Sequence, residues 1–174
     1  TLGAEIENLT LLGTVALNGT GNGLANVLTG NAGVNSLSGL GGDDAIVAGN
    51  GDDTLDGGSG TDTIDWSASS EAGGVFDLLA GTATSADGAE SEVMANFEDF
   101  IGTGNDDTII GTDGANSLKG GNGNDTLTGL DGNDRLLTET TGATTFTSTY
   151  DDNGNLKSRG NGVITDTYAY DAES

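Results

Sequence analysis

The stretch GLGGDDAIVAGNGDDTLDGGSGTDTIDWS, residues 39–67, repeats three kinds of residue at one interval of nine. They are the aliphatic residues Ile46, Leu55 and Ile64, the acids Asp44, Asp53 and Asp62, and the glycines Gly42, Gly51 and Gly60. A fixed internal period of this kind indicates a repeat architecture. The period therefore decides the fold before any local propensity is considered.

The repeating unit is Gly-x-x-Gly-x-Asp-x-U-x, in which U is a large aliphatic residue. Units begin at Gly21, Gly30, Gly39, Ala48, Gly57, Gly102, Gly111, Gly120 and Gly129. Their sixth positions hold Asn26, Asn35, Asp44, Asp53, Asp62, Asp107, Asn116, Asp125 and Asp134. In the first unit Leu24 stands where glycine is expected, which leaves the register of that unit open.

Each position has a physical role. Glycine reaches positive φ without a Cβ penalty, so it permits a tight loop and lets backbone carbonyls turn inward. At the fourth position of one unit Asn105 replaces glycine, and Asn is the next best residue for a left-handed conformation. The last three residues of a unit read as a short strand whose U side chain points to one face. Two units would then close one 18-residue coil, and stacked coils would bury the U column between two parallel sheets.

This motif resembles the glycine-rich nonapeptide repeat of the hemolysin-type (RTX) calcium-binding family. The units Gly57–Asp65 and Gly120–Thr128 match at every defined position. The resemblance implies a parallel β-roll with Ca²⁺ held between loops, and export from a Gram-negative cell by type I secretion. We therefore predict an all-β chain, a parallel β-roll (β-solenoid) in two stacked blocks with an interrupting β segment and a C-terminal β-hairpin.

Calcium is the cofactor that this resemblance implies. Loops two units apart would be neighbours on one edge of the roll, so an ion could bind between them. An ion between them can take one carboxylate from each loop plus backbone carbonyls. We expect Asp44 with Asp62 and Asp107 with Asp125 to form sites, and Asp53 with Asn35 and Asp134 with Asn116 to form weaker ones. The glycines expected at these sites are Gly42, Gly51, Gly60, Gly123 and Gly132. The alternative is that the aspartates only form turns; the fifth-position acids Asp43, Asp52 and Asp106 are expected to face solvent.

The charge balance restricts the partners. The chain has 28 acidic and 4 basic residues, a formal net charge of −24, and the first basic residue is Lys119. Nucleic acid and anionic membrane are poor partners for such a chain, whereas multivalent cations are good ones.

No apolar run approaches the length of a membrane span. The absence of cysteine suits a secreted bacterial protein without disulfides, and residues 1–5 lack the start of a secretory signal, which favours another signal or a fragment of a longer chain.

Four segments follow from the pattern. They are a first block with its lead-in (1–66), a connecting β segment (67–101), a second block (102–137) and a Thr-rich linker with a hairpin (138–174). In the connector we expect a strand at 75–79, turns at 81–84 and 86–88, and a helical turn at 91–94. Its aromatic residues, with Trp66, are expected to join the two blocks, although Trp66 could instead form a carbohydrate platform. Tyr-Asp pairs 20 residues apart in 138–174 resemble one YD (RHS-type) repeat or a simple cap.

Catalysis is poorly supported, because a chain without His or Cys lacks the usual nucleophile arrangements and histidine zinc sites. The acids are accounted for by the repeat, so we predict that the chain is not an enzyme. Two readings remain. One is a calcium-binding region of a larger secreted or cell-surface protein that folds in extracellular calcium. The other is a structural unit of an adhesin, surface layer or fibre whose copies join end to end.

Overall fold

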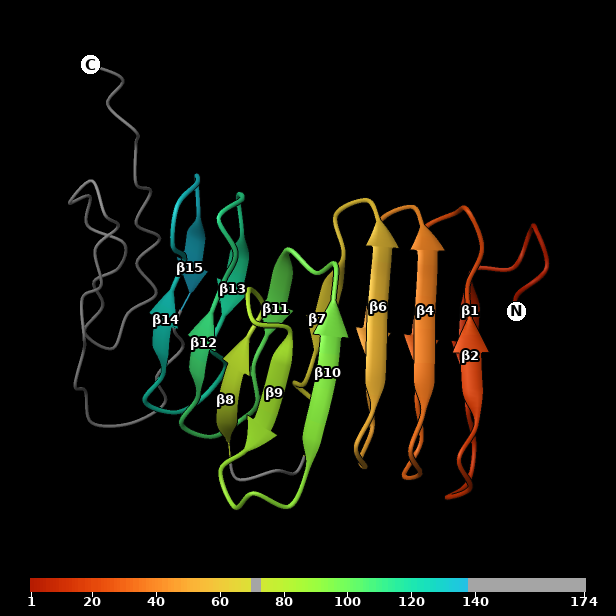
Figure 1. Ribbon diagram of the computed structural model, residues 1–174, viewed down its shortest axis with the longest axis horizontal. Helices are drawn as coiled ribbons and strands as arrows, with labels where there is room; N and C mark the ends of the chain where they lie inside the picture. The colour runs from red at the N-terminus through yellow and green to blue at the C-terminus, as the bar shows by residue number, and fades with distance from the viewer. Residues whose placement is uncertain (70–72, 138–174) are drawn as a thin grey trace.

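The computed structural model describes residues 1–69 and 73–137, and the described residues form fifteen strands and no helix. The strands build two sheets that lie against each other along one elongated roll (Figure 1). The chain passes from one sheet to the other and back as it advances along the roll. The prediction of an all-β solenoid is confirmed.

One sheet has seven strands and the other has eight. The seven-stranded sheet contains, in spatial order, β1 (Asn8–Thr10), β3 (Val27–Thr29), β5 (Ala45–Val47), β7 (Thr63–Asp65), β11 (Asp99–Ile101), β13 (Ser117–Lys119) and β15 (Arg135–Leu137). The eight-stranded sheet contains β2 (Asn18–Thr20), β4 (Ser36–Gly41), β6 (Thr54–Ser59), β10 (Ser91–Ala95), β9 (Thr82–Ser85), β8 (Gly74–Asp77), β12 (Thr108–Ile110) and β14 (Thr126–Thr128).

The strand register follows the sequence period. Ile46 of β5 lies opposite Ile64 of β7, and Leu37 of β4 lies opposite Leu55 of β6, with parallel pairing in both cases. Each partner is two units along the chain, so two units close one coil as the spacing predicts. Leu28 lies opposite Ile46, which fixes the register that the sequence had left open for the first unit.

The U residues form the core between the sheets. Leu28, Ile46, Ile64, Ile109 and Leu118 are all 0% exposed. Side chains alternate across a strand, so the residues on either side of each U position face outward. A row of single aliphatic side chains makes a thin core, and the loops must therefore contribute to stability.

The interruption widens one sheet only. In the seven-stranded sheet β7 pairs directly with β11, and Ile64 lies opposite Phe100. In the other sheet three strands, β10, β9 and β8, lie between β6 and β12, where a regular coil would place one. Strands are about 4.8 Å apart, so two extra strands widen this sheet by about 10 Å.

Aromatic side chains fill the space that the extra strands open. The ring centroids of Phe76 and Phe100 are 4.7 Å apart, and Trp66 lies 5.2 Å from Phe76 and 5.5 Å from Phe100. Two of the pairs are tilted and the Trp66–Phe100 pair is stacked, and aromatic pairs at these separations are favourable beyond their buried area. The expectation that aromatic residues join the two blocks is confirmed. Trp66 is 2% exposed, so its ring is buried and does not form a carbohydrate platform on the surface.

Two local expectations for the connector are wrong. Residues 91–94, expected as a helical turn, lie in strand β10, and most of 81–84, expected as a turn, lies in strand β9. Burial alternates along β10, so the segment fits a strand that is covered on one face only. The turn at 86–88 is confirmed. The hairpin and YD-like repeat expected in 138–174 lie outside the described residues.

The described ranges contain no helix long and apolar enough to cross a membrane.

Candidate metal centre

The sixth-position side chains lie in two rows, one on each edge of the roll. The first edge carries the loops that precede strands of the seven-stranded sheet, and its row is Asn26, Asp44, Asp62, Glu98, Asn116 and Asp134. The second edge carries the loops that precede strands of the eight-stranded sheet, and its row is Asn35, Asp53 and Glu92, then Asp107 and Asp125. The register assigns Glu98 and Glu92 to these rows, because Phe100 and Met94 occupy U positions.

Main-chain hydrogen bonds link each row. On the first edge Asn26 donates its N–H to Oδ1 of Asp44 at 2.7 Å, and Asp44 donates to Oδ1 of Asp62 at 2.8 Å. On the second edge Asn35 donates to Oδ1 of Asp53 at 2.7 Å. The same edge joins Asp107 to Oδ1 of Asp125 at 3.1 Å. All four sixth-position neighbours predicted from the sequence are adjacent, since Asn116 likewise donates to Asp134 at 3.0 Å.

The second oxygen of several carboxylates accepts no hydrogen bond. Among the described residues no donor reaches the buried Oδ2 atoms of Asp44, Asp53, Asp62 and Asp125. Asp44, Asp53 and Asp62 are at most 2% exposed, so water does not replace the missing donors at their surface. A buried, charged oxygen without a partner is costly, and its position calls for a cation.

Glycine at the first position keeps this place open in the loops that begin at Gly39, Gly120 and Gly129. A Cβ on Gly39 would meet Oδ2 of Asp44 and would lie 2.5 Å from the carbonyl oxygen of Gly57 in the next coil. Gly120 and Gly129 are crowded in the same way by the Oδ2 atoms of Asp125 and Asp134. Carboxylate and carbonyl oxygens therefore converge where a side chain is absent. An all-oxygen environment of this kind suits Ca²⁺, which takes six to eight oxygen ligands.

The loops fall into two types. In the first type, which we call open loops, the second and fourth positions both have positive φ. These pairs are Leu40 and Gly42, Gly49 and Gly51, Gly58 and Gly60, Gly121 and Gly123, and Leu130 and Gly132. All five glycines expected at calcium sites belong to this set, and the four Oδ2 atoms without donors lie in open loops.

In the second type, which we call capped loops, the second position holds Asn or Thr and the sixth-position side chain is already bonded. Asn31 donates its N–H to Oδ1 of Asn35 at 2.8 Å, and Thr103 donates to Oδ2 of Asp107 at 2.7 Å. The second-position side chain then accepts the fourth-position N–H, as Thr103 Oγ1 does from Asn105 at 3.1 Å. The left-handed conformation expected for Asn105 is wrong, because this bond holds the loop without a positive φ.

Asparagine amides tie the capped loops to the preceding coil. Asn35 Nδ2 donates to the carbonyl oxygen of Leu17 at 2.8 Å, and Asn116 Nδ2 donates to that of Glu98 at 2.7 Å. Asn31 Nδ2 also donates to the carbonyl of Val15 at 3.1 Å. In each case a side-chain amide donates a hydrogen bond to a main-chain carbonyl oxygen of the preceding coil. The capped loops with Asn at the sixth position thus have a protein donor where the open loops have only oxygen atoms.

The electrostatic environment of the open loops is unfavourable for bare carboxylates. Burial, as the largest cause, raises the pKa of Asp53 and of Asp62 to about 6 and the pKa of Asp125 to about 7, and neighbouring acids add to each shift. Burial also raises the pKa of Asp44. No Lys or Arg precedes residue 119 to offset these charges. A bound divalent cation would remove both the desolvation cost and the repulsion.

The ligand set must include the main chain. In the part of the chain that the structure describes, no three acidic side chains lie close enough together to bind a metal by themselves. The repeat supplies one sixth-position carboxylate per loop, so two neighbouring loops supply two. The remaining oxygens have to come from carbonyls such as that of Gly57.

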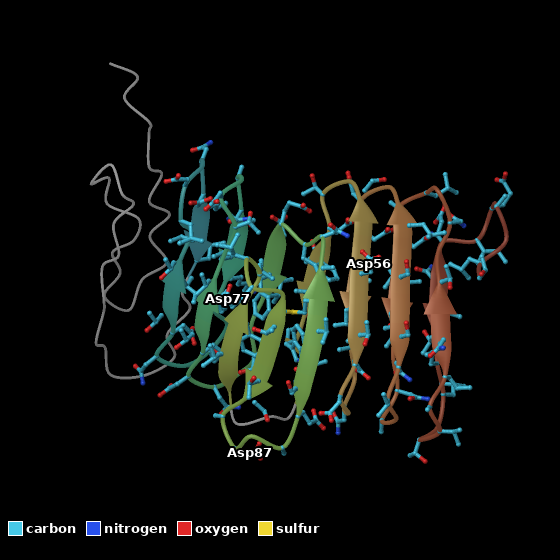
Figure 2. All side chains as sticks on the ribbon, in the orientation of Figure 1. Asp56, Asp77 and Asp87 are labelled. Carbon is cyan, nitrogen blue, oxygen red and sulfur yellow. The ribbon has the colours of Figure 1, made fainter. Side chains whose placement is uncertain are left out.

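Other aspartates have local roles. The fifth-position acids Asp43, Asp52 and Asp106 are exposed, as expected, and each accepts a backbone N–H from a neighbouring coil or strand. Figure 2 marks three more acids away from the loop rows: Asp56 on β6, Asp77 at the end of β8, and Asp87 in the turn after β9. Asp77 accepts the N–H of Ala80 at 2.8 Å, and Asp87 accepts that of Ala89 at 2.9 Å. Asp77 and Asp87 therefore stabilise local turns.

Sequence reasoning did not find Glu98 or Glu92. The signal for Glu98 was present, because it lies 36 residues after Asp62, two full coils, and Phe97-Glu98-Asp99-Phe100 parallels Ile6-Glu7-Asn8-Leu9. Nothing in the period points to Glu92, which reaches its row only because β10 pairs with β6.

Comparison with known proteins agrees with this geometry. The family described as RTX calcium-binding nonapeptide repeat (4 copies) matches residues 20–55, 29–64 and 101–136. No curated protein matches the chain. The matched ranges cover the open and capped loops of both blocks and leave out the strands β8, β9 and β10 of the interruption. Residues 20–64 and 101–136 are therefore RTX calcium-binding nonapeptide repeats, and they form a β-roll.

Proposed function

We propose that this β-roll binds Ca²⁺ in its open loops and belongs to a larger secreted or cell-surface bacterial protein that folds when it meets extracellular calcium. The supporting observation is the set of buried Oδ2 atoms without donors in Asp44, Asp53, Asp62 and Asp125. The ligands would be these carboxylates, with Glu98 beside Asp62 and Asp134 in its own open loop, together with loop carbonyls. Asp107, Asn35 and Asn116 would take part through their contacts with Asp125, Asp53 and Asp134.

Calcium binding and folding are coupled in this proposal. The chain carries a net charge of −24, and its core is a thin row of aliphatic residues. An ion that binds only the assembled loops contributes its binding free energy to folding. The roll would be weakly ordered in the low calcium of a cytosol and folded at the millimolar calcium found outside cells. Type I secretion as a flexible chain is consistent with this order of events.

A calcium titration tests the proposal. We expect circular dichroism of the full chain to show a cooperative gain of β structure as Ca²⁺ rises, with no comparable change in Mg²⁺. Asp62→Asn should raise the calcium concentration at the midpoint, whereas Asp77→Asn, which changes the charge equally outside the loops, should not. A chain that is equally folded in chelator and in calcium would overturn the proposal.

The alternative is a self-assembling structural unit of an adhesin, surface layer or fibre. Each sheet of the roll has two edge strands, and the exposed edges of a solenoid favour continuation by another copy. Light scattering separates the two proposals. A monomer at every calcium concentration supports the folding module, and large assemblies above a calcium threshold support the structural unit.

We assign no catalytic role to the roll, which is a structural calcium-binding unit. The division into a first block, connector, second block and tail stays a proposal that limited proteolysis in calcium can test.

A further inference from the structure

The interruption carries a buried acid that the nonapeptide pattern does not contain. Glu92 on β10 is 2% exposed, and it lies outside the residues that match the repeat family. Val93 lies opposite Thr54, so Glu92 is the neighbour of Asp53, which is 1% exposed. Two buried carboxylates from different parts of the chain thus lie side by side on the second edge.

Each of the two carboxylates has one oxygen without a protein donor. Among the described residues no hydrogen-bond donor reaches Oε1 of Glu92 or Oδ2 of Asp53, and the buried Oε2 of nearby Glu90 also has none. Repulsion from Glu90 and Asp53 adds to burial in raising the pKa of Glu92 to about 7. Two states can relieve the repulsion between these buried carboxylates: one with a proton on Glu92, and one with a cation between the oxygen atoms of Asp53 and Glu92.

The backbone holds the two acids in place. Val93 donates its N–H to the carbonyl oxygen of Asp53 at 2.9 Å, and Ser91 donates to Oδ1 of Asp52 at 2.9 Å. These bonds lie on both sides of Glu92, so the pairing of β10 with β6 sets its position beside Asp53 in the folded roll. No basic residue lies near Glu92 in the sequence, where the first Lys or Arg is Lys119.

We propose that a divalent cation of the Ca²⁺ class binds between Asp53 and Glu92 and fastens the interrupting strands to the first repeat block. Asp53 and Glu92 supply the two carboxylates, as paired acids do in the repeat. Glu90 adds negative potential at Glu92, and main-chain carbonyls complete an all-oxygen ligand set of the kind Ca²⁺ and Mg²⁺ accept. The site shares Asp53 with the proposed repeat loops but depends on a residue of the insertion.

The test counts bound Ca²⁺ on the full chain by equilibrium dialysis at pH 7.5. Glu92→Gln keeps the shape of the side chain and removes its charge, and the matched control is Glu5→Gln at an exposed position near the N-terminus. We expect Glu92→Gln to bind one ion fewer than the unmodified chain and Glu5→Gln to bind the same number. An unchanged count in a folded Glu92→Gln chain would show that Glu92 is only a protonated acid, and the proposal would be wrong.

A second measurement covers the case in which Glu92→Gln folds poorly. Hydrogen exchange of the unmodified chain is followed for the amides of Ser91 and Val93 as Ca²⁺ is added. Greater protection of these two amides in calcium than in a folded, calcium-free acidic sample, with each rate divided by the intrinsic exchange rate at its own pH, supports the site, and equal protection overturns it. Failure of this site leaves calcium uptake by the loops intact, whereas failure of the proposed function removes calcium binding altogether.

Discussion

The N–H of Asp62 donates to Oε2 of Glu98 at 2.9 Å, although 36 residues separate them. Glu98 therefore occupies the place that the next aspartate of the first edge would hold if the repeat had not been interrupted. Asn116 continues the row by donating its Nδ2 to the carbonyl oxygen of Glu98 at 2.7 Å. The interruption leaves this edge intact and disturbs only the opposite sheet.

Glu98→Gln should weaken calcium-induced folding. The change keeps an acceptor for the N–H of Asp62 but removes the charge beside Asp62, whose Oδ2 has no donor among the described residues. We expect the calcium midpoint to rise about tenfold, which corresponds to ~1.4 kcal/mol. Circular dichroism titration measures the midpoint, with Glu5→Gln as the control. A midpoint equal to that of the control would mean that Glu98 contributes only a hydrogen bond.

Without calcium, the roll should become less stable as the pH rises. Burial raises the pKa of Asp53 and Asp62 to about 6 and the pKa of Asp125 and Glu92 to about 7. Carboxyl groups in an unfolded chain titrate near pH 4, so the folded state binds more protons between these values. The contribution of these carboxyl groups to the free energy of unfolding is then fully present below about pH 4 and is lost as the pH rises through 6 to 7.

Urea unfolding in a chelating buffer checks this pH dependence. The urea midpoint should be higher at pH 4.5 than at pH 8, and excess Ca²⁺ should restore stability at pH 8. A midpoint that increases from pH 4.5 to pH 8 in the absence of calcium would contradict the predicted sign.

Asn35→Asp should make a capped loop dependent on calcium. The new carboxylate keeps an acceptor for the N–H of Asn31 but loses the Nδ2 donor that reaches the carbonyl oxygen of Leu17 at 2.8 Å. A buried acceptor left without its donor costs about 1–3 kcal/mol. We expect lower stability in chelator, measured by urea unfolding, and recovery of most of the loss in calcium. Asn50→Asp, at an exposed position, is the control.

Gly39→Ala should obstruct an open loop. The added Cβ would meet Oδ2 of Asp44 and the carbonyl oxygen of Gly57, which are the atoms proposed to face the ion. Gly104→Ala is the matched control, because a Cβ there meets nothing within 4 Å. We expect Gly39→Ala alone to lower the number of calcium ions bound, as measured by calorimetric titration. Equal counts for the two variants would place the ion elsewhere.

The sequence predicts the roll and its core because one period fixes both. Ile46, Leu55 and Ile64 repeat every nine residues, so the strand, the buried face and the partner two units away follow from a single number. The positive φ of Gly42 and Gly60 follows from the same pattern. Calcium coordination by these loops is a prediction from the chemistry of their oxygen atoms rather than from the nine-residue period, and a calcium titration tests it.

The missed features depend on contacts that the period does not encode. Glu92 reaches Asp53 only through the pairing of β10 with β6, which closes a loop of more than thirty residues. The difference between open and capped loops depends on the second position of the unit, where Asn31 or Thr103 replaces glycine and supplies its own hydrogen bonds. That position is undefined in the motif, so the sequence pattern ranked the loops only by Asp or Asn at the sixth position and could not separate open from capped loops.

The two sides of the roll differ in how a local disturbance can spread. Along the first edge each sixth-position residue from Asn26 to Asp134 is hydrogen-bonded to the next, so a calcium ion bound at one place would influence its neighbours over the full length. Along the second edge the antiparallel strand β9 separates the row that ends at Glu92 from the row that begins at Gly74 and Asp107. Calcium binding along the first edge would therefore be cooperative over the whole row. Along the second edge the two separate rows would bind calcium independently of each other.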